Sequence, residues 1–263
     1  MVRTLDTEDL AERVRRVYRT VATNPSAEFH FETGRALAER LGYPAAELAA
    51  IPAGAVDSFA GVGYFLDLAA LRPGETVVDL GSGSGMDSFL AARQVGSGGR
   101  VIGVDMTDDQ LTKARRLATE AGIGNVWFQT GRIERLPLED AVADVMISNG
   151  VINLSPSKPT VFAEAARVLR PGGRLALADI VTERPLPAEV TGNAALWAAC
   201  IGGAAQASDY LIAITQAGFE VEEVRENRQY RFRSTSALNA TARWGVKSVS
   251  MLARRPSRGA TMR

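Results

Sequence analysis

The stretch Val77-Val78-Asp79-Leu80-Gly81-Ser82-Gly83-Ser84-Gly85 decides the fold of this chain. Its apolar first half predicts a buried β-strand over residues 76–80, and the strand runs directly into a glycine loop. Glycines in such a loop let the backbone approach a ligand closely and turn free N–H groups toward it. The stretch therefore predicts an α/β sheet with a ligand at the carboxyl end of its first strand.

Short apolar segments alternate with helical ones after Pro73-Gly74, which is typical of a parallel sheet with crossover helices. We expect strands at 76–80, 101–105, 126–129, 145–148 and 174–179. Helices are expected near 87–95, 107–121 and 160–169. A further helix at 208–217, followed by strands at 219–224 and 246–253, predicts an antiparallel hairpin at the sheet edge. The pattern indicates an open, doubly wound sheet.

A helical segment precedes the sheet. Apolar residues recur at spacings of four, three and four residues over 7–21, at Leu10, Val14, Val17 and Val21. Shorter helices are expected at 33–41 and 44–50. The arginines of the first helix fit a solvated face, with an anion contact over a ligand as the alternative. We therefore divide the chain into a helical cap over 1–70 that covers the substrate, an α/β domain over 71–253, and a basic, disordered tail over 254–263.

The composition narrows the functional classes. Of 263 residues, 46% are hydrophobic and 23% charged, which excludes a disordered or fibrous chain. Thirty basic and thirty acidic side chains cancel, so no global field favours nucleic acid or anionic lipid. One cysteine and one histidine exclude a disulfide framework and make a metal site improbable. Because neither a signal peptide nor a long apolar run is visible, we expect a cytoplasmic protein without membrane contact.

Three positions around the glycine loop bear on the ligand. Met86 stands where the dinucleotide fingerprint G-x-G-x-x-G has its last glycine, which disfavours a pyrophosphate. Asp79, two residues before the loop, suits a nearby ammonium group. Asp105 ends the second strand, where a carboxylate can accept both hydroxyls of a ribose; the alternative is an N-cap for the following helix. Together these features favour S-adenosylmethionine over NAD.

At this point the sequence resembles a known family, the class I S-adenosylmethionine-dependent methyltransferases, from Leu71 to about Phe219. Within that family it is similar to the arsenite methyltransferase branch in the strings Val101-Ile-Gly-Val-Asp-Met-Thr107, Ile147-Ser-Asn-Gly-Val-Ile-Asn-Leu-Ser-Pro156, Arg170-Pro-Gly-Gly173, Ala178-Asp-Ile180 and Trp197-Ala-Ala-Cys-Ile-Gly-Gly203. The resemblance implies a Rossmann-like, seven-stranded sheet in the order 3-2-1-4-5-7-6. It also implies S-adenosyl-L-methionine as cofactor and S-adenosyl-L-homocysteine as product.

The resemblance also implies the residues that contact the cofactor. The loop residues Gly81, Ser82 and Gly83 would let the methionine portion pass, beside Asp79. Asp105 would hold the ribose and Met106 would pack on the adenine. The turn Gly131-Arg132-Ile133 would contact the adenine edge through its backbone, because the Arg132 side chain cannot accept a hydrogen bond. Asn149 would approach the methionine amino group.

The sequence departs from the arsenite branch in its thiols. Val62, Ser88 and Gly150 stand where that branch frequently has cysteine, so Cys200 alone remains. A trivalent arsenic is held strongly by about three thiolates. The acceptor pocket that we expect is instead aromatic, with a few polar groups, as suits a small organic molecule. Its predicted residues, each of which also fits core packing, are Phe59, Tyr64, Phe65, Asn153, Trp197 and Cys200.

We therefore predict a methyltransferase acting on a small-molecule acceptor, first of all an organic one. The alternative is arsenite, or another thiophilic metalloid or thiol, methylated with Cys200 and exogenous thiols. A nicotinamide oxidoreductase and a non-catalytic cofactor-binding protein are further alternatives. Nucleic acid is disfavoured because the fourth strand ends without the motif that holds a flipped base. Catalytic candidates are Cys200, which as a thiolate needs no base, and His30 as general base, with Asp179 and Glu183 as alternative bases. The oligomeric state stays open.

Overall fold

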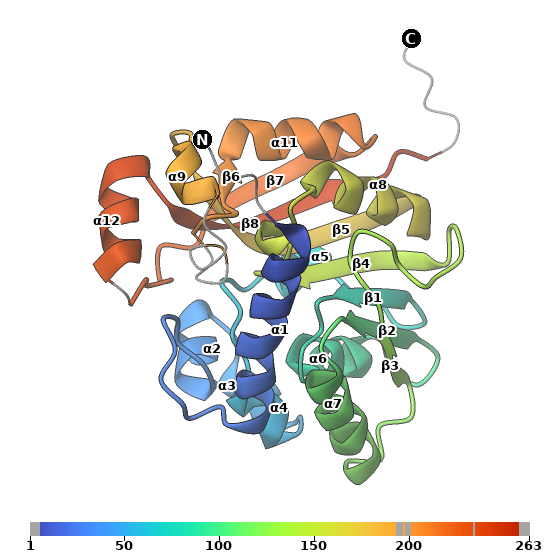
Figure 1. The fold of residues 1–263 in the computed structure, drawn as a ribbon. Helices are drawn as coiled ribbons and strands as arrows, with labels where there is room; N and C mark the ends of the chain where they lie inside the picture. Colours follow the sequence, from blue (N-terminus) through green and yellow to red (C-terminus); the bar gives the residue numbers. More distant parts are fainter. Residues whose placement is uncertain (1–5, 193–196, 198–200, 234, 258–263) are drawn as a thin grey trace.

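The computed structural model describes residues 6–192, 197, 201–233 and 235–257. Within this part of the chain one sheet forms, in the order β3-β2-β1-β4-β5-β8-β7, with a short β6 beside β5 (Figure 1). The predicted strand order is thus confirmed. Its strands are β1 (Thr76–Leu80), β2 (Arg100–Asp105), β3 (Val126–Thr130), β4 (Ala143–Asn149), β5 (Leu169–Thr182), β6 (Ala205–Gln206), β7 (Glu220–Glu226) and β8 (Lys247–Arg254).

The central strand β1 explains why the sheet is buried on both faces. All five of its residues are buried, as expected for a parallel strand with helices on each side. Val77 faces the core shared with α6 (Met86–Val95) and α7 (Asp108–Glu120). Val78 faces the core shared with α8 (Lys158–Val168) and α11 (Ala207–Gln216). Successive side chains of β1 point to opposite faces of the sheet and therefore pack into two separate hydrophobic cores.

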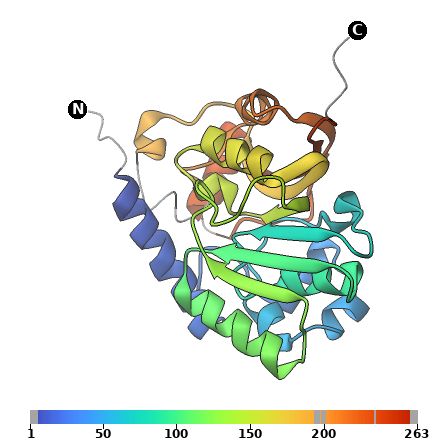
Figure 2. The same ribbon diagram turned by 90° about the vertical axis from the view of Figure 1, so that its right-hand side faces the viewer.

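The N-terminal helices extend the core on the α6 and α7 side. They are α1 (Thr7–Thr23), α2 (Arg35–Leu41), α3 (Ala45–Ala49), α4 (Ala53–Asp57) and α5 (Leu66–Ala69). Leu10 and Val14 of α1 are buried in the same cluster as strand residues. In Figure 2 the parallel strands point toward α1, which packs beside α7. Helix α1 therefore crosses the carboxyl edge of the sheet.

Some elements were not predicted from the sequence. The hairpin of β7 and β8 contains an intervening helix, α12 (Thr235–Trp244), and the turn after β4 holds a 3-10 helix, η1 (Ile152–Leu154). A short helix, α9 (Ala188–Thr191), follows β5. No helix was predicted for the segment of α12, although that segment is amphipathic. No helix in the described ranges is both long and apolar enough to cross a membrane.

Candidate functional site

A cavity opens at the carboxyl edge of the sheet, beneath α1. The loop after β1, the ends of β2, β3 and β4, and one face of α1 form its wall. All ten residues predicted to contact a cofactor line it: Asp79, Gly81, Ser82, Gly83, Asp105, Met106, Gly131, Arg132, Ile133 and Asn149. The topology thus brings together side chains that lie as much as 70 positions apart in the sequence.

The glycine loop has the backbone that its sequence indicates. Gly81 and Gly83 have φ angles of +68° and +53°, in the left-handed region that favours glycine. A Cβ on Gly81 would also lie 2.4 Å from Val151 Cγ2, so a side chain has no room there. Ser82 lines the cavity, and its buried Oγ has no hydrogen-bond partner within the described chain. The loop therefore presents its backbone to the cavity.

Asp105 connects the loop to the second βα unit. Its Oδ2 accepts from the Gly83 N–H at 2.9 Å, and its Oδ1 accepts from the Thr107 N–H at 2.8 Å. Burial raises the pKa of Asp105, and these backbone donors act against that rise. Each carboxylate oxygen can still accept another hydrogen bond. Asp105 therefore orders the start of α7 and also offers acceptors to a ligand.

Two further carboxylates are buried in the wall, at Asp79 and Asp87. The Ser88 hydroxyl donates to Asp79 Oδ2 at 2.6 Å, and the Tyr43 hydroxyl donates to Asp87 Oδ1 at 2.6 Å. Burial, and next the charge of Asp87, raise the pKa of Asp79 to about 8. Burial raises the pKa of Asp87 to about 6 despite its two side-chain donors, Tyr43 and Asn149. Neither carboxylate forms an ion pair with a cation of the described chain.

Asn149, at the end of β4, joins Asp87 to the segment 61–63. Its Oδ1 accepts from the Val62 N–H at 2.8 Å. Its Nδ2 lies 3.0 Å from Asp87 Oδ2 and 3.1 Å from the Gly63 carbonyl oxygen, both acceptors. The amide is therefore occupied by protein groups, although the residue lines the cavity. Its approach to a methionine amino group stays a prediction.

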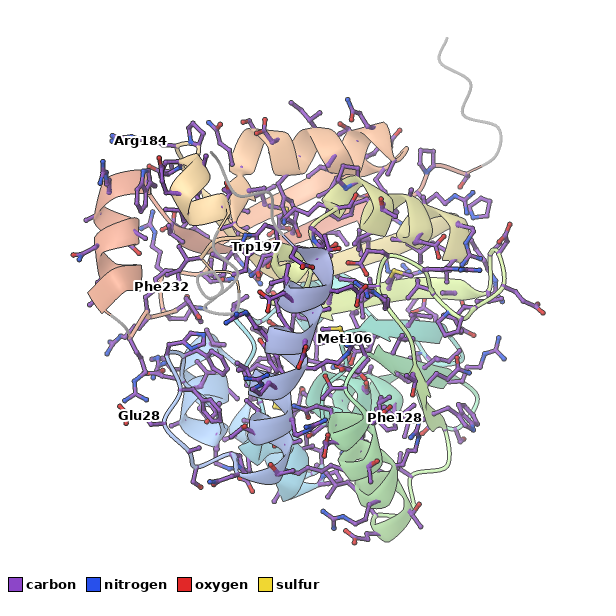
Figure 3. All side chains as sticks on the ribbon, in the orientation of Figure 1. Glu28, Met106, Phe128, Arg184, Trp197 and Phe232 are labelled. Carbon is purple, nitrogen blue, oxygen red and sulfur yellow. The ribbon has the colours of Figure 1, made fainter. Side chains whose placement is uncertain are left out.

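Helix α1 contributes side chains that were not predicted to belong to the site. Leu10, Ala11, Val14 and Tyr18 line the cavity, and Figure 3 shows Met106 beside this helix. Gln110 Nε2 donates to the Tyr18 carbonyl at 2.8 Å, and Arg19 pairs with Asp109 at 2.9 Å. The apolar period predicts an amphipathic helix, but it does not say which surface the helix covers. That depends on contacts between distant segments.

Of the predicted acceptor residues, only Phe59 lines the cavity among those that the structure describes. Phe65 is fully buried in the core before α5, and Tyr64 packs edge-on against Tyr43. Asn153 is fully buried in η1. Trp197 donates its indole N–H to the Thr191 carbonyl at 2.7 Å. Cys200 lies outside the described residues.

The candidate general bases lie away from the cavity. His30, between α1 and α2, packs edge-on against Phe31 with ring centroids 4.7 Å apart. Asp179 is buried and accepts from the Tyr210 hydroxyl at 2.7 Å. Glu183 pairs with Lys247 at 2.8 Å. None of the three lines the cavity, and no cluster suited to a metal occurs in the described part of the chain.

Comparison with known proteins identifies the family. A methyltransferase domain family matches residues 71–229, which is more than half of the chain. The chain belongs to the class I S-adenosylmethionine-dependent methyltransferases. The cofactor of this family is S-adenosylmethionine, and the cavity fits it. The glycine loop lets a ligand approach the backbone, and the carboxylates of Asp79 and Asp105 supply acceptors for cationic and hydroxyl groups.

Several relatives of this methyltransferase are named for arsenic. The arsenite methyltransferase of Halobacterium salinarum is 45% identical over 193 residues, covering 73% of this chain and 49% of that protein. The human arsenite methyltransferase is 38% identical over 152 residues, covering 54% of this chain and 40% of that protein. The chain spans about half the length of the curated relatives it matches.

Two solved structures that resemble this chain are also methyltransferases. The arsenic(III) S-adenosylmethionine methyltransferase of Chlamydomonas reinhardtii is 31% identical, with a TM-score of 0.63, covering 87% of this chain and 76% of that chain. A geranyl diphosphate methyltransferase bound to GPP and sinefungin is 21% identical, with a TM-score of 0.66, covering 94% of this chain and 99% of that chain. The second likeness concerns the fold alone.

Proposed function

We propose that this methyltransferase acts on trivalent arsenic that enters as a complex with small thiols. The observation that carries the proposal is the 45% identity to an arsenite methyltransferase over 73% of the chain. With a single cysteine, the protein supplies at most one sulfur ligand, Cys200, and exogenous thiols supply the others. This acceptor takes the place of the organic molecule that the sequence analysis put first.

The cofactor contacts that we propose follow the cavity wall. The backbone of Gly81, Ser82 and Gly83 lies along the methionine portion, and Asp79 is next to its ammonium group. Asp105 accepts from the ribose hydroxyls, and Met106 packs on the adenine. These contacts are supported because the residues and the turn 131–133 line the same cavity.

The reaction requires the protein mainly to hold the acceptor and the cofactor in the right relative position. When bound, the cofactor supplies a methyl group that its sulfonium has already activated. Proximity and orientation contribute ~7–11 kcal/mol to reactions of this kind. A trivalent arsenic attacks through its lone pair and loses no proton, so it needs no general base. The position of His30, Asp179 and Glu183 away from the cavity agrees with such an acceptor.

Transfer of tritium from methyl-labelled S-adenosylmethionine to arsenite tests the proposal. We expect labelled methylarsenic products when glutathione is present, and little product without it, because the chain lacks a complete set of thiols. Cys200→Ser should reduce the rate by about tenfold or more, as loss of one metal ligand or its support commonly does. No labelled arsenic product under any thiol condition would reject arsenic as the acceptor.

A second candidate is a small organic acceptor, and one observation favours it. A Cβ on Gly150 would lie 3.1 Å from Val62 Cγ1, so the two positions where the resembling branch has cysteines face each other. Here they form an apolar contact beside Asn149 and Gly61 of the cavity wall. Incubation with labelled cofactor and a metabolite extract tests this candidate. It predicts an organic product whose yield Cys200→Ser leaves unchanged.

A further inference from the structure

Asp87 is a charged residue of the cavity wall that the contacts proposed above leave without a role. It is the second residue of α6, where the helix N-terminus favours an anion. Its side chain is buried, and both its oxygens accept hydrogen bonds from neutral groups, the Tyr43 hydroxyl and the Asn149 amide. This arrangement fixes the carboxylate in one orientation without neutralising its charge.

The cavity as a whole has an excess of negative charge. Asp79 is buried in the same wall, close enough for the charge of Asp87 to raise its pKa. The one cationic residue of the wall, Arg132, lies near Glu8 and Glu134, with N–O separations of 3.5 and 3.7 Å. A buried charge is costly unless a partner compensates it. Neither carboxylate has an ion pair in the described chain, so a ligand with two cationic groups would compensate the charge of Asp87 and favour ionisation of Asp79.

We propose that Asp87 makes the cavity select the sulfonium cofactor over its neutral thioether product. The inference rests on the methyltransferase function and does not depend on the acceptor. S-adenosylmethionine has two cationic groups, an ammonium and a sulfonium, whereas S-adenosylhomocysteine keeps only the ammonium. Once the methyl group has left, one carboxylate loses its partner. The product is then held less tightly, and it exchanges for fresh cofactor.

The charge of Asp87 sets the pH at which this selectivity acts. The groups that face it are Tyr43 from the segment before α3, Tyr64 from the segment before α5, Asp79 from β1 and Asn149 from β4. Because burial raises its pKa to about 6, Asp87 is ionised above that pH and neutral below it. The preference for the sulfonium form is therefore complete well above pH 6 and declines as the pH falls through that value. Tyr43→Phe removes a donor to the ionised form, so the decline should begin at a higher pH.

Calorimetric titration with three ligands tests the proposal. The ligands are S-adenosylmethionine, S-adenosylhomocysteine and sinefungin, an analogue with an amine in place of the sulfonium. An opposite charge at close range shifts a carboxyl pKa by ~1–3 units, which by linkage is about tenfold or more in affinity for that charge. At pH 7.5, Asp87→Asn should weaken the binding of S-adenosylmethionine and of sinefungin about tenfold. It should weaken the binding of S-adenosylhomocysteine by less than about threefold. The matched control is Asp67→Asn, at an exposed carboxylate paired with Arg225 outside the cavity.

The outcomes separate the inference from the function. An equal loss of affinity for all three ligands in Asp87→Asn would show that the residue only supports the structure, and would overturn the proposal. The ratio of the two dissociation constants in the wild-type protein, measured from pH 5 to 8, needs no variant. As the pH falls through about 6, the affinity for S-adenosylmethionine should fall relative to the affinity for S-adenosylhomocysteine. A ratio that stays constant overturns the proposal. Both measurements concern the binding of cofactor and product alone, so they remain valid tests even if the protein does not methylate arsenic.

Discussion

Asp105 is the residue on which the ribose contact depends. Asp105→Asn keeps the size of the side chain but removes its charge and one acceptor. Hydrogen bonds to charged groups contribute about 1.5–3 kcal/mol, so S-adenosylmethionine should bind ~10–100-fold more weakly. Calorimetry measures the change, and Asp108→Asn, an exposed carboxylate at the start of α7, is the control. Equal affinities in wild type and Asp105→Asn would exclude the contact.

We expect the Asp79 carboxyl group to release a proton when the cofactor binds. Its pKa of about 8 means that most molecules hold this proton at pH 7. A cationic ligand stabilises the carboxylate and lowers its pKa, so binding releases the proton, and affinity rises with pH up to about 8. Calorimetry at pH 7 in two buffers of different ionisation enthalpy counts the protons. Asp79→Asn should abolish this release, and an unchanged count would contradict the role.

At the scale of residues, the predicted cofactor residues line one cavity together, whereas Phe59 alone of the described acceptor candidates lines it. The wall residues follow strand ends, and topology places strand ends together. Phe65 and Tyr64 do not line this cavity, and an aromatic residue near a site has the same sequence signal whether it faces a ligand or the core. Asp87 was missed, since a single acidic residue in a first helical turn is ordinary.

Among the elements, α1 lines the cavity at the carboxyl edge of the sheet, and we expect it to cover the bound cofactor. Leu10 is buried, 2% exposed, and lines the cavity from above, so Leu10→Ala weakens the packing of α1 on the sheet. Buried leucine-to-alanine changes cost about 2–5 kcal/mol. If half of that free energy is lost from the state in which α1 covers the cofactor, the cofactor should dissociate about fivefold to seventyfold faster. Stopped-flow displacement of bound cofactor measures the rate.

The control for this change is an exposed residue of the same helix. Arg13 is exposed and pairs with Asp9 four residues earlier, so Arg13→Ala should leave the dissociation rate unchanged. A Leu10→Ala protein that is less stable but releases cofactor at the wild-type rate would show that α1 does not cover the bound ligand. The helix itself was predictable from its apolar period, whereas its place over the strand ends was not.

For the whole molecule, the helical cap and the sheet share one core. Leu10 and Leu37 of the cap belong to the same buried cluster as Val77 and Val145 of the sheet. We therefore expect thermal unfolding in one cooperative transition, with equal calorimetric and van't Hoff enthalpies. Two resolved transitions would instead establish the cap over 1–70 as an independent unit. The predicted domain boundary near residue 70 stays a prediction until that measurement.

The fold as a whole was accessible from the sequence because strand, glycine loop and helix repeat in a regular order. The family follows from motifs within residues 71–219, and the resemblance to that family implies the strand order. The acceptor was less accessible, since it depends on which side chains face one another across distant loops. Val62 and Gly150 illustrate this, because only the structure shows that they are in contact.

The most direct test of the account is a titration of the wild-type protein with S-adenosylmethionine and, separately, with NADH. The cavity beneath α1, with its carboxylates and its tight glycine loop, predicts saturable binding of S-adenosylmethionine at one site per chain. It predicts no binding of NADH, whose pyrophosphate the buried carboxylates would repel. Binding of NADH without binding of S-adenosylmethionine at millimolar concentration would contradict the account.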